Sequence, residues 1–385
     1  MAKKIGLYVH IPFCIQKCKY CDFHSFCVAG QNPGQYVACL LREMEQVSGI
    51  MQDYQVDTIY LGGGTPSVLS DDQIEKISEK IQGCFFVDPQ AEFTMEVNPG
   101  TVTFQGLKRY RACGINRLSM GVQSLNDSLL ETLGRIHHVK DFLEAYAAAR
   151  IAGFDNLSFD FMFALPEQTL DDWLKTLQKA VLFQPEHLSV YGLQLEEGTE
   201  LYRRRNEYHF ADDELDREMY HNACWFLKEN GYEQYEISNF SRPGFASKHN
   251  LRYWEMKEYY GLGSGASSFF QNARFENPRD LQEYFNFIDN WSADFYQKDT
   301  ETAEERMDEF MFLGLRKTKG VSDQDFQEQF QVSFFDRYGS AIEKHLNNGL
   351  LLQDCQRIFL SEKGLDLANV VMSDFIELEK GEEGL

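Results

Sequence analysis

The chain has 385 residues, 43% hydrophobic and 25% charged, a balance typical of a globular protein large enough for more than one domain. Its formal net charge of −23 argues against nucleic acid as a main partner, because phosphate binding needs a basic surface. No apolar run approaches the ~20 residues that span a bilayer, and the start MAKKIGLYVHIPF lacks a signal-peptide cleavage site. We therefore expect a cytoplasmic protein.

The first half of the chain alternates short β-rich runs with stretches of helical period. The predicted strands are 5–11, 57–61, 92–97, 115–121, 156–163 and 187–195. After the first strand, a helical face is predicted at Tyr36, Val37, Leu40, Leu41, Met44 and Val47. Further on, Ser70 and Gln73 resemble a capping box. Six β-α units in succession imply a parallel sheet covered by helices, either an open doubly wound sheet or an incomplete (β/α) barrel.

The pattern changes after residue 195, and we predict three domains, 1–200, 201–300 and 301–385. The second combines a helical stretch with aromatic, turn-rich segments. The third ends in a helix followed by a hairpin, which is the outline of a winged-helix unit. It carries 9 Lys or Arg against 18 Asp or Glu. A wing that reads DNA would not have that charge, so we expect another use for this domain.

Three cysteines, Cys14, Cys18 and Cys21, have the spacing C-x3-C-x2-C directly after the first predicted strand. In a reducing compartment, such a group favours metal binding over disulfides. A cubane cluster has four irons, so three thiolates leave one iron open to a ligand from outside the protein. An open iron is what the chelation and reductive cleavage of S-adenosylmethionine (SAM) requires.

Two other ligand sets fit the same spacing. His10 or His24 would complete a Cys3His zinc site in a non-catalytic protein. Cys27 would instead supply a fourth cluster ligand and give a closed electron-transfer centre. Spacing alone leaves these alternatives open.

The run CIQKCKYC resembles the cluster motif of the radical SAM superfamily, and LGGGTPS (61–67) resembles its glycine motif. Polar residues also end later predicted strands, and such residues share one site at the carboxyl end of a β/α array. The resemblance implies a [4Fe-4S] cluster held by the three cysteines. It also implies that SAM is bound by Tyr8, Tyr20, Gly63, Gly64, Thr65, Glu96, Gln123, Arg135 and Asp160.

Within the superfamily, HIPFC, GGGTPS and MGVQS resemble the oxygen-independent coproporphyrinogen III oxidases and their relatives. This resemblance implies a partial (β/α)6 barrel, a small α/β segment and a winged-helix-like C-terminal domain. Phe23, however, stands where the oxidases have a further cysteine. Only four residues precede the first strand, where the oxidases carry an N-terminal extension. Both departures count against coproporphyrinogen III oxidase activity, which remains the alternative function, and whether the chain is an enzyme stays open.

The stretch KHNLRYW (248–254) is similar to the HNxxYW signature of the haem chaperones of the HemW group. The resemblance implies that haem is a cargo passed to haem-requiring acceptor proteins and bound by His249, Asn250, Tyr253 and Trp254. A neutral imidazole is a natural axial ligand of haem iron. A histidine that only hydrogen-bonds in an aromatic loop is the alternative. The sequence leaves open the acceptor, the electron donor, the role of SAM cleavage, covalent attachment of haem, homodimer formation and membrane contact.

Overall fold

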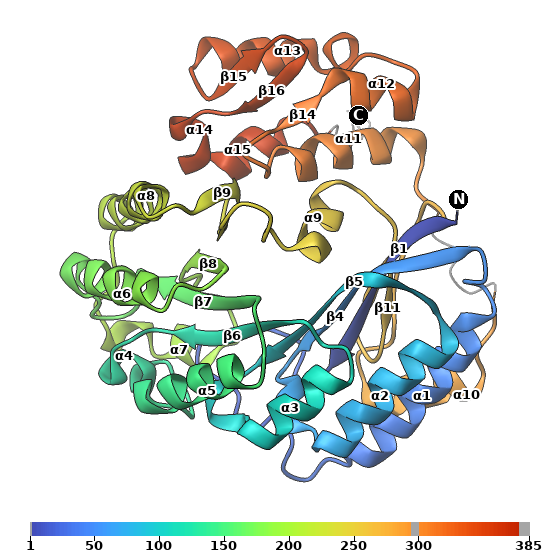
Figure 1. Cartoon of the computed structure of the whole chain (residues 1–385). Coiled ribbons are helices and arrows are strands. Elements are labelled where there is room, and N and C mark those ends of the chain that lie inside the picture. Colours follow the sequence, from blue (N-terminus) through green and yellow to red (C-terminus); the bar gives the residue numbers. More distant parts are fainter. Residues whose placement is uncertain (1, 294–299, 377–385) are drawn as a thin grey trace, which may run out of the picture.

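The computed structural model describes residues 2–293 and 300–376 (Figure 1). Residues 1, 294–299 and 377–385, which belong to the three predicted domains, lie outside the described part. The main sheet is open and has eleven strands in the order β13-β12-β11-β1-β4-β5-β6-β7-β8-β10-β9. Its centre consists of six parallel strands: β1 (Lys3–Ile11), β4 (Tyr54–Gly63), β5 (Phe86–Val97), β6 (Arg117–Gln123), β7 (Leu157–Phe163) and β8 (His187–Gly192).

Each of these six strands overlaps one predicted strand, so the (β/α)6 order inferred from the sequence is confirmed. Helices run between the strands and cover the outer face of the sheet (Figure 1): α1 (Pro33–Ser48), α2 (Asp71–Cys84), α3 (Phe104–Ala112), α4 (Asp127–Thr132), α5 (Val139–Ile151) and α6 (Leu170–Leu182). The expected capping box opens α2, where Ser70 Oγ accepts from the Gln73 backbone N–H at 3.3 Å. Gln73 Oε1 accepts in return from the Ser70 N–H at 2.9 Å.

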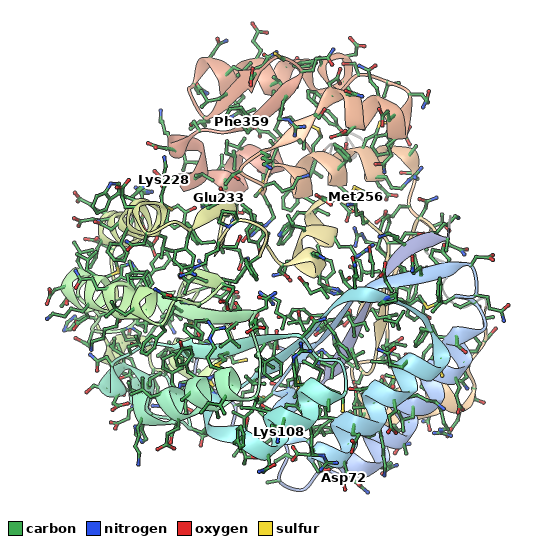
Figure 2. The ribbon with its side chains drawn as sticks, viewed as in Figure 1. Asp72, Lys108, Lys228, Glu233, Met256 and Phe359 are labelled. Atoms are coloured by element: carbon green, nitrogen blue, oxygen red, sulfur yellow. The ribbon has the colours of Figure 1, made fainter. Side chains whose placement is uncertain are left out.

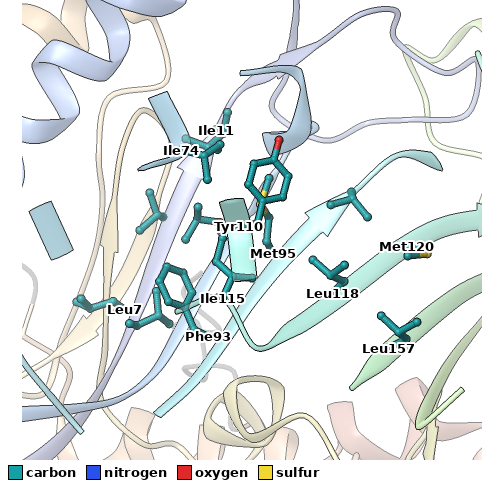
Figure 3. Packing of buried hydrophobic residues seen from close by; sticks show 14 of the residues in the cluster. Leu7, Ile11, Ile74, Phe93, Met95, Tyr110, Ile115, Leu118, Met120 and Leu157 are labelled. Carbon is teal, nitrogen blue, oxygen red and sulfur yellow. The ribbon is translucent and has the colours of Figure 1, made fainter. Parts of the chain in front are cut away.

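The main core lies between the outer face of the sheet and these helices (Figure 3). Strand residues such as Leu7, Phe93 and Leu118 pack there against Ile74 of α2 and Tyr110 of α3, all at most 2% exposed. Successive strand residues point to opposite faces, so the alternate positions face the barrel interior. That interior is polar, with buried Thr94, Arg117, Ser119, Ser158 and His187.

The segments between residues 200 and 289 extend both edges of the same sheet and flank them with helices. On one side, α7 (Glu200–Arg203) and α8 (Asp213–Glu229) lead into β9 (Glu233–Glu236) and β10 (Asn239–Ser241), and β10 pairs antiparallel with β8. On the other side, β11 (Tyr259–Leu262) pairs parallel with β1 and is followed by β12 (Ser267–Phe270), β13 (Ala273–Glu276) and α10 (Leu281–Asp289). Between these two parts of the chain, α9 (Lys248–Trp254) lies against β4, between the barrel and the C-terminal domain (Figure 1). The stretch that looked like a separate α/β segment therefore completes the sheet.

A buried carboxylate ties α1 to the β11–β13 edge. Glu43 is 1% exposed and accepts from the Gly263 N–H at 2.8 Å, Asn277 Nδ2 at 2.6 Å and the Tyr284 hydroxyl at 2.7 Å. The apolar periodicity of α1 does not identify Glu43, because a charged residue interrupts the otherwise apolar face of the helix. Glu43 thus joins α1 to three donors that lie 220 to 241 positions later in the chain.

We expect Glu43→Ala to lower the free energy of unfolding by about 3 kcal/mol, because buried donors would lose their acceptor. Urea unfolding followed by circular dichroism measures this change. Glu45→Ala is the control on the same helix, since its side chain is 60% exposed and forms a surface ion pair with Lys80, and it should change stability by less than about 1 kcal/mol. Equal effects of the two substitutions would contradict the anchoring role of Glu43.

The C-terminal domain has its own core, which includes Met311, Phe326, Phe334, Ile358 and Val371. Its elements follow the order helix, strand, two helices and hairpin, as in a winged-helix unit. They are α11 (Ala303–Gly314), β14 (Val321–Ser322), α12 (Asp323–Phe330), α13 (Phe334–Asn347), β15 (Leu351–Asp354) and β16 (Arg357–Leu360), followed by α14 (Glu362–Asp366) and α15 (Ala368–Ser373). The predicted helix and hairpin are confirmed. Figure 2 shows Met256, just after α9, between the barrel and this domain.

Candidate functional site

A cavity of about 480 Å³ opens at the carboxyl ends of the barrel strands, and Cys14, Cys18 and Cys21 all line it. Its volume lies in the range of small-molecule sites. Cys14 ends β2 (Phe13–Cys14), which pairs with β3 (Phe26–Cys27), and the other two cysteines follow in the loop. That loop is held at Lys19, whose N–H donates to Leu133 O at 3.0 Å and whose carbonyl accepts from the Leu201 N–H at 2.7 Å.

The surroundings of the thiols suit an iron–sulfur cluster. Arg135 Nη1 donates to Cys18 Sγ at 3.3 Å and Thr65 Oγ1 donates to Cys14 Sγ at 3.6 Å, so two donors already face sulfur. Burial raises the pKa of Cys14 and raises that of Cys21 to about 11. Metal binding would displace these protons, because thiolates are the ligands. Among the described residues, no three His, Cys, Asp or Glu side chains already stand as a metal site, so ligation by the three cysteines is a proposal.

The side chains of the alternative ligand sets do not line this cavity. The ring nitrogens of His10 are hydrogen-bonded to the Tyr8 hydroxyl at 2.8 Å and to His24 O at 2.9 Å. His24 Nε2 lies 3.2 Å from Ser264 Oγ. Cys27 is exposed and its thiol donates to a backbone carbonyl, that of Ile15, at 3.1 Å. In this conformation none of the three faces the space that the cysteines share.

Gly63, which ends β4, and Gly64, which follows it, line the cavity, and the chain's own packing requires them. A Cβ on Gly64 would lie 2.7 Å from the Phe13 carbonyl oxygen. A Cβ on Gly63, where φ is +111°, would lie 2.4 Å from the His10 ring. The family resemblance assigned both glycines to SAM binding. In the structure, the close contact of β4 with β1 and β2 already excludes a side chain.

Two partly buried carboxylates, Glu96 and Asp160, face the cavity from neighbouring parts of the sheet, as predicted for the strand ends. Glu96 accepts from the Tyr60 hydroxyl at 2.8 Å and from the Gly63 N–H at 3.2 Å. Burial, with the nearby charge of Asp160, raises the pKa of Glu96 to about 7. Asp160 accepts from Ser119 Oγ at 3.1 Å, and burial raises its pKa too. Such a pair suits a ligand with positive charge.

Gln123 lines the same cavity in an uncommon backbone conformation, with φ of +64°. The register of β6 against β7 shifts between Gly121 and Gln123, so the strand bulges there. Arg135 Nη2 donates to the Gly121 carbonyl at 2.6 Å, which links the bulge to the cysteine loop. Strain of this kind persists where surrounding contacts fix it, and sequence periodicity carries no sign of it.

Of the nine residues predicted for SAM, eight line the cavity, and Tyr8 does not. The Tyr8 ring lies behind that of Tyr60, with 6.3 Å between the ring centroids. Tyr20 lines the cavity from the cysteine loop. Further residues line the cavity that were not predicted from the sequence, among them Ser119, Tyr191 and Gln194. From the sequence, strand alternation would have found Ser119, which stands four residues before the predicted Gln123 and so would share its face.

The residues predicted for haem lie on α9, away from the cavity. His249 is 0% exposed, its Nδ1 lies 2.9 Å from Thr58 Oγ1 and its Nε2 lies 2.9 Å from the Tyr253 hydroxyl. Burial lowers the pKa of His249 to about 3, so the ring is neutral. Arg316 of the C-terminal domain lies 4.4 Å above the Trp254 ring. In this conformation both nitrogens of the proposed haem ligand are occupied.

Comparisons with known proteins agree with this architecture. Residues 8–180 match the radical SAM superfamily, and residues 302–367 match the HemN C-terminal domain. The haem chaperone HemW of Lactococcus lactis is 35% identical over 98% of this chain and 98% of its own. The chain belongs to the HemW family. The radical SAM superfamily carries a [4Fe-4S] cluster and SAM, so the family implies both for this HemW-family chain.

Two further relatives extend the comparison. The mouse mitochondrial radical S-adenosyl methionine domain-containing protein 1 is 33% identical over 94% of this chain and 85% of its own. The solved Escherichia coli coproporphyrinogen III oxidase HemN superposes with a TM-score of 0.84 over 98% of this chain and 90% of that chain. At 22% identity the HemN match shows a shared fold. No helix within residues 2–293 and 300–376 is long and apolar enough to cross a membrane.

Proposed function

We propose that this HemW-family protein is a haem chaperone that binds haem and transfers it to apo-acceptor proteins. The observation that carries the proposal is the 35% identity to a haem chaperone over 98% of both chains. The proposal keeps the protein in the cytoplasm and includes haem-requiring acceptors as partners.

The cavity supports the cofactor part of the proposal. Cys14, Cys18 and Cys21 would hold the [4Fe-4S] cluster, because all three line one cavity beside two hydrogen-bond donors. When bound, the reduced cluster would supply an electron for SAM cleavage, so an electron donor belongs to the proposal. Glu96 and Asp160 would attract the ammonium and sulfonium charges of SAM, and Arg135 would screen the charge of the thiolates.

For haem, His249 remains the proposed axial ligand, with Asn250, Tyr253 and Trp254 around it. The burial of α9 sets a condition on this assignment. Iron would reach His249 only after its hydrogen bond to Thr58 or Tyr253 breaks and its ring separates from Tyr60 of β4. Haem binding through His249 therefore predicts a rearrangement of α9.

An anaerobic haem titration followed through the haem absorption band tests the function. We expect stoichiometric binding by the wild type and by His345→Ala, a matched control that removes a buried histidine of the C-terminal domain. We expect His249→Ala to bind at least tenfold more weakly, since one coordinate bond would be lost. Absence of binding by the wild type would contradict the haem-chaperone proposal, and protoporphyrinogen formed from coproporphyrinogen III would then favour the oxidase alternative.

Equal binding by His249→Ala and the wild type would keep the chaperone function and reject His249 as the ligand. Transfer is measured separately, by mixing the haem-loaded protein with a haem-free globin and following the globin spectrum. Transfer faster than the release of free haem is expected of a chaperone.

A further inference from the structure

The helix that carries the HNxxYW motif is fixed to the inner face of the barrel. At its start, the backbone N–H groups of Lys248 and His249 both donate to the Glu92 carboxylate at 3.0 Å. Near its end, Arg252 forms an ion pair with Asp57, and its Nη1 donates to a backbone carbonyl of the following loop at 2.9 Å. Asp57 and Glu92 belong to β4 and β5, so two strands hold α9 at both ends.

The side chain of His249 is equally constrained. Thr58 Oγ1 lies 2.9 Å from His249 Nδ1 and also accepts from Arg252 Nε at 3.3 Å. With Arg252 donating to its oxygen, the threonine hydroxyl can donate to His249 Nδ1, an arrangement that places the ring proton on Nε2, toward Tyr253. The imidazole plane is thereby fixed by two hydrogen bonds.

That fixed plane lies against Tyr60. The two rings are stacked, with 5.3 Å between centroids and 24° between planes. The Tyr60 hydroxyl in turn donates to Glu96 Oε1 at 2.8 Å, and Glu96 lines the cavity. A continuous line of contacts therefore joins the motif helix to a carboxylate of the proposed SAM site.

We propose that His249 is a positioning residue of the SAM cavity, because its stacked ring holds Tyr60 where the phenol donates to Glu96. The inference rests on the SAM binding proposed above and does not depend on haem. It gives the motif a role in the conformation in which His249 is sealed from solvent. In that role Tyr253, bonded to His249 Nε2, keeps the imidazole in plane.

The protonation of Glu96 makes this role measurable. Tyr60 donates to the ionised carboxylate, which lowers a pKa that burial otherwise raises to about 7. Because SAM is cationic at its ammonium and sulfonium groups, affinity should be full above about pH 7 and fall as the pH drops through this pKa. Loss of the Tyr60 hydrogen bond should raise the pKa of Glu96, so the fall in SAM affinity should then occur at higher pH. The other charged or titratable groups that influence Glu96, or are influenced by it, are Tyr8 on β1, Arg117 on β6, Asp160 on β7 and Tyr253 on α9.

The test is SAM affinity against pH, measured by equilibrium binding to the cluster-reconstituted, haem-free protein. Tyr60→Phe keeps the ring and removes only the hydroxyl, so SAM affinity at pH 7 should fall about tenfold. The pH at which affinity falls should also be higher than in the wild type. His249→Ala should show the same shift to higher pH. His249→Phe retains an aromatic ring against Tyr60, so its SAM affinity and pH dependence should stay close to those of the wild type. His345→Ala should match the wild type. Iron and sulfide content, measured in every variant, shows that the cluster is intact.

If Tyr60→Phe shows the same pH dependence of SAM affinity as the wild type, the proposal is overturned. It is also overturned if His249→Phe binds SAM as weakly as His249→Ala. Because haem is absent from these measurements, a failure of haem binding leaves their meaning unchanged. If the wild type binds no SAM, the proposed cofactor site fails instead. The two proposals are therefore separable.

Discussion

Cys18→Ala is expected to lose the [4Fe-4S] cluster. The three thiols that line the cavity are the proposed ligands, and a cubane held by two of them would leave two irons without protein sulfur. The Cys18 thiol also accepts from Arg135, so its removal would leave that guanidinium facing an empty position. After anaerobic reconstitution, iron and sulfide should fall to background and the visible absorption of the cluster should disappear.

Cys27→Ala is the matched control for the cluster experiment. Cys27 is exposed, lies six residues after Cys21 in the same loop region and does not line the cavity, so its replacement should leave iron and sulfide unchanged. Full iron in Cys18→Ala would contradict the ligand assignment. Loss of iron in Cys27→Ala would favour the closed four-cysteine centre, and a colourless protein containing zinc would favour the Cys3His alternative.

Glu96→Gln and Asp160→Asn are each expected to weaken SAM binding by about 10- to 100-fold, because hydrogen bonds to charged groups contribute about 1.5–3 kcal/mol. Both changes are nearly isosteric, so they remove charge while the neighbouring hydroxyls of Tyr60 and Ser119 keep an oxygen to donate to. Equilibrium binding of SAM to the reconstituted protein at pH 8 measures the loss. At that pH the wild-type Glu96 carboxyl, with a pKa of about 7, is mostly ionised.

The cluster should survive both substitutions, since neither carboxylate is a proposed ligand, and iron content checks this point. Glu144→Gln on the exposed face of α5 removes one charge far from the cavity and should leave SAM affinity unchanged. Wild-type affinity in both cavity variants would reject the set of SAM contacts inferred from the resemblance.

Much of the barrel could be predicted because its signals are local. Strand β7 reads as LSFDFMF, an almost continuous buried run of the kind that parallel strands require. The capping box at Ser70 and Gln73 marks the start of α2 within four residues. Glu96 and Asp160 could be assigned to one site because parallel strands end at the same edge of a sheet. Each of these inferences needs only neighbours in the chain or the shared direction of strands.

Other features depend on contacts between distant segments. The pairing of β11 with β1 joins residues about 250 positions apart, so residues 259–276 read as a separate segment until the sheet is seen. Glu43 looks like a surface residue of α1 until Gly263, Asn277 and Tyr284 converge on it. The sequence likewise marked His249 as a residue of interest without showing that it is buried.

The sequence alone was sufficient to recognise the cysteine spacing, the β/α order and the family motifs, because cluster ligation, backbone periodicity and turn formation depend on residues close in the chain. The tertiary structure decided which of these residues meet. It brought eight of the nine predicted SAM residues to one cavity, and it set Tyr8 and His249 behind it. Burial and hydrogen-bond partners come from segments that only folding brings together, and they set the protonation of Glu96 and the orientation of His249.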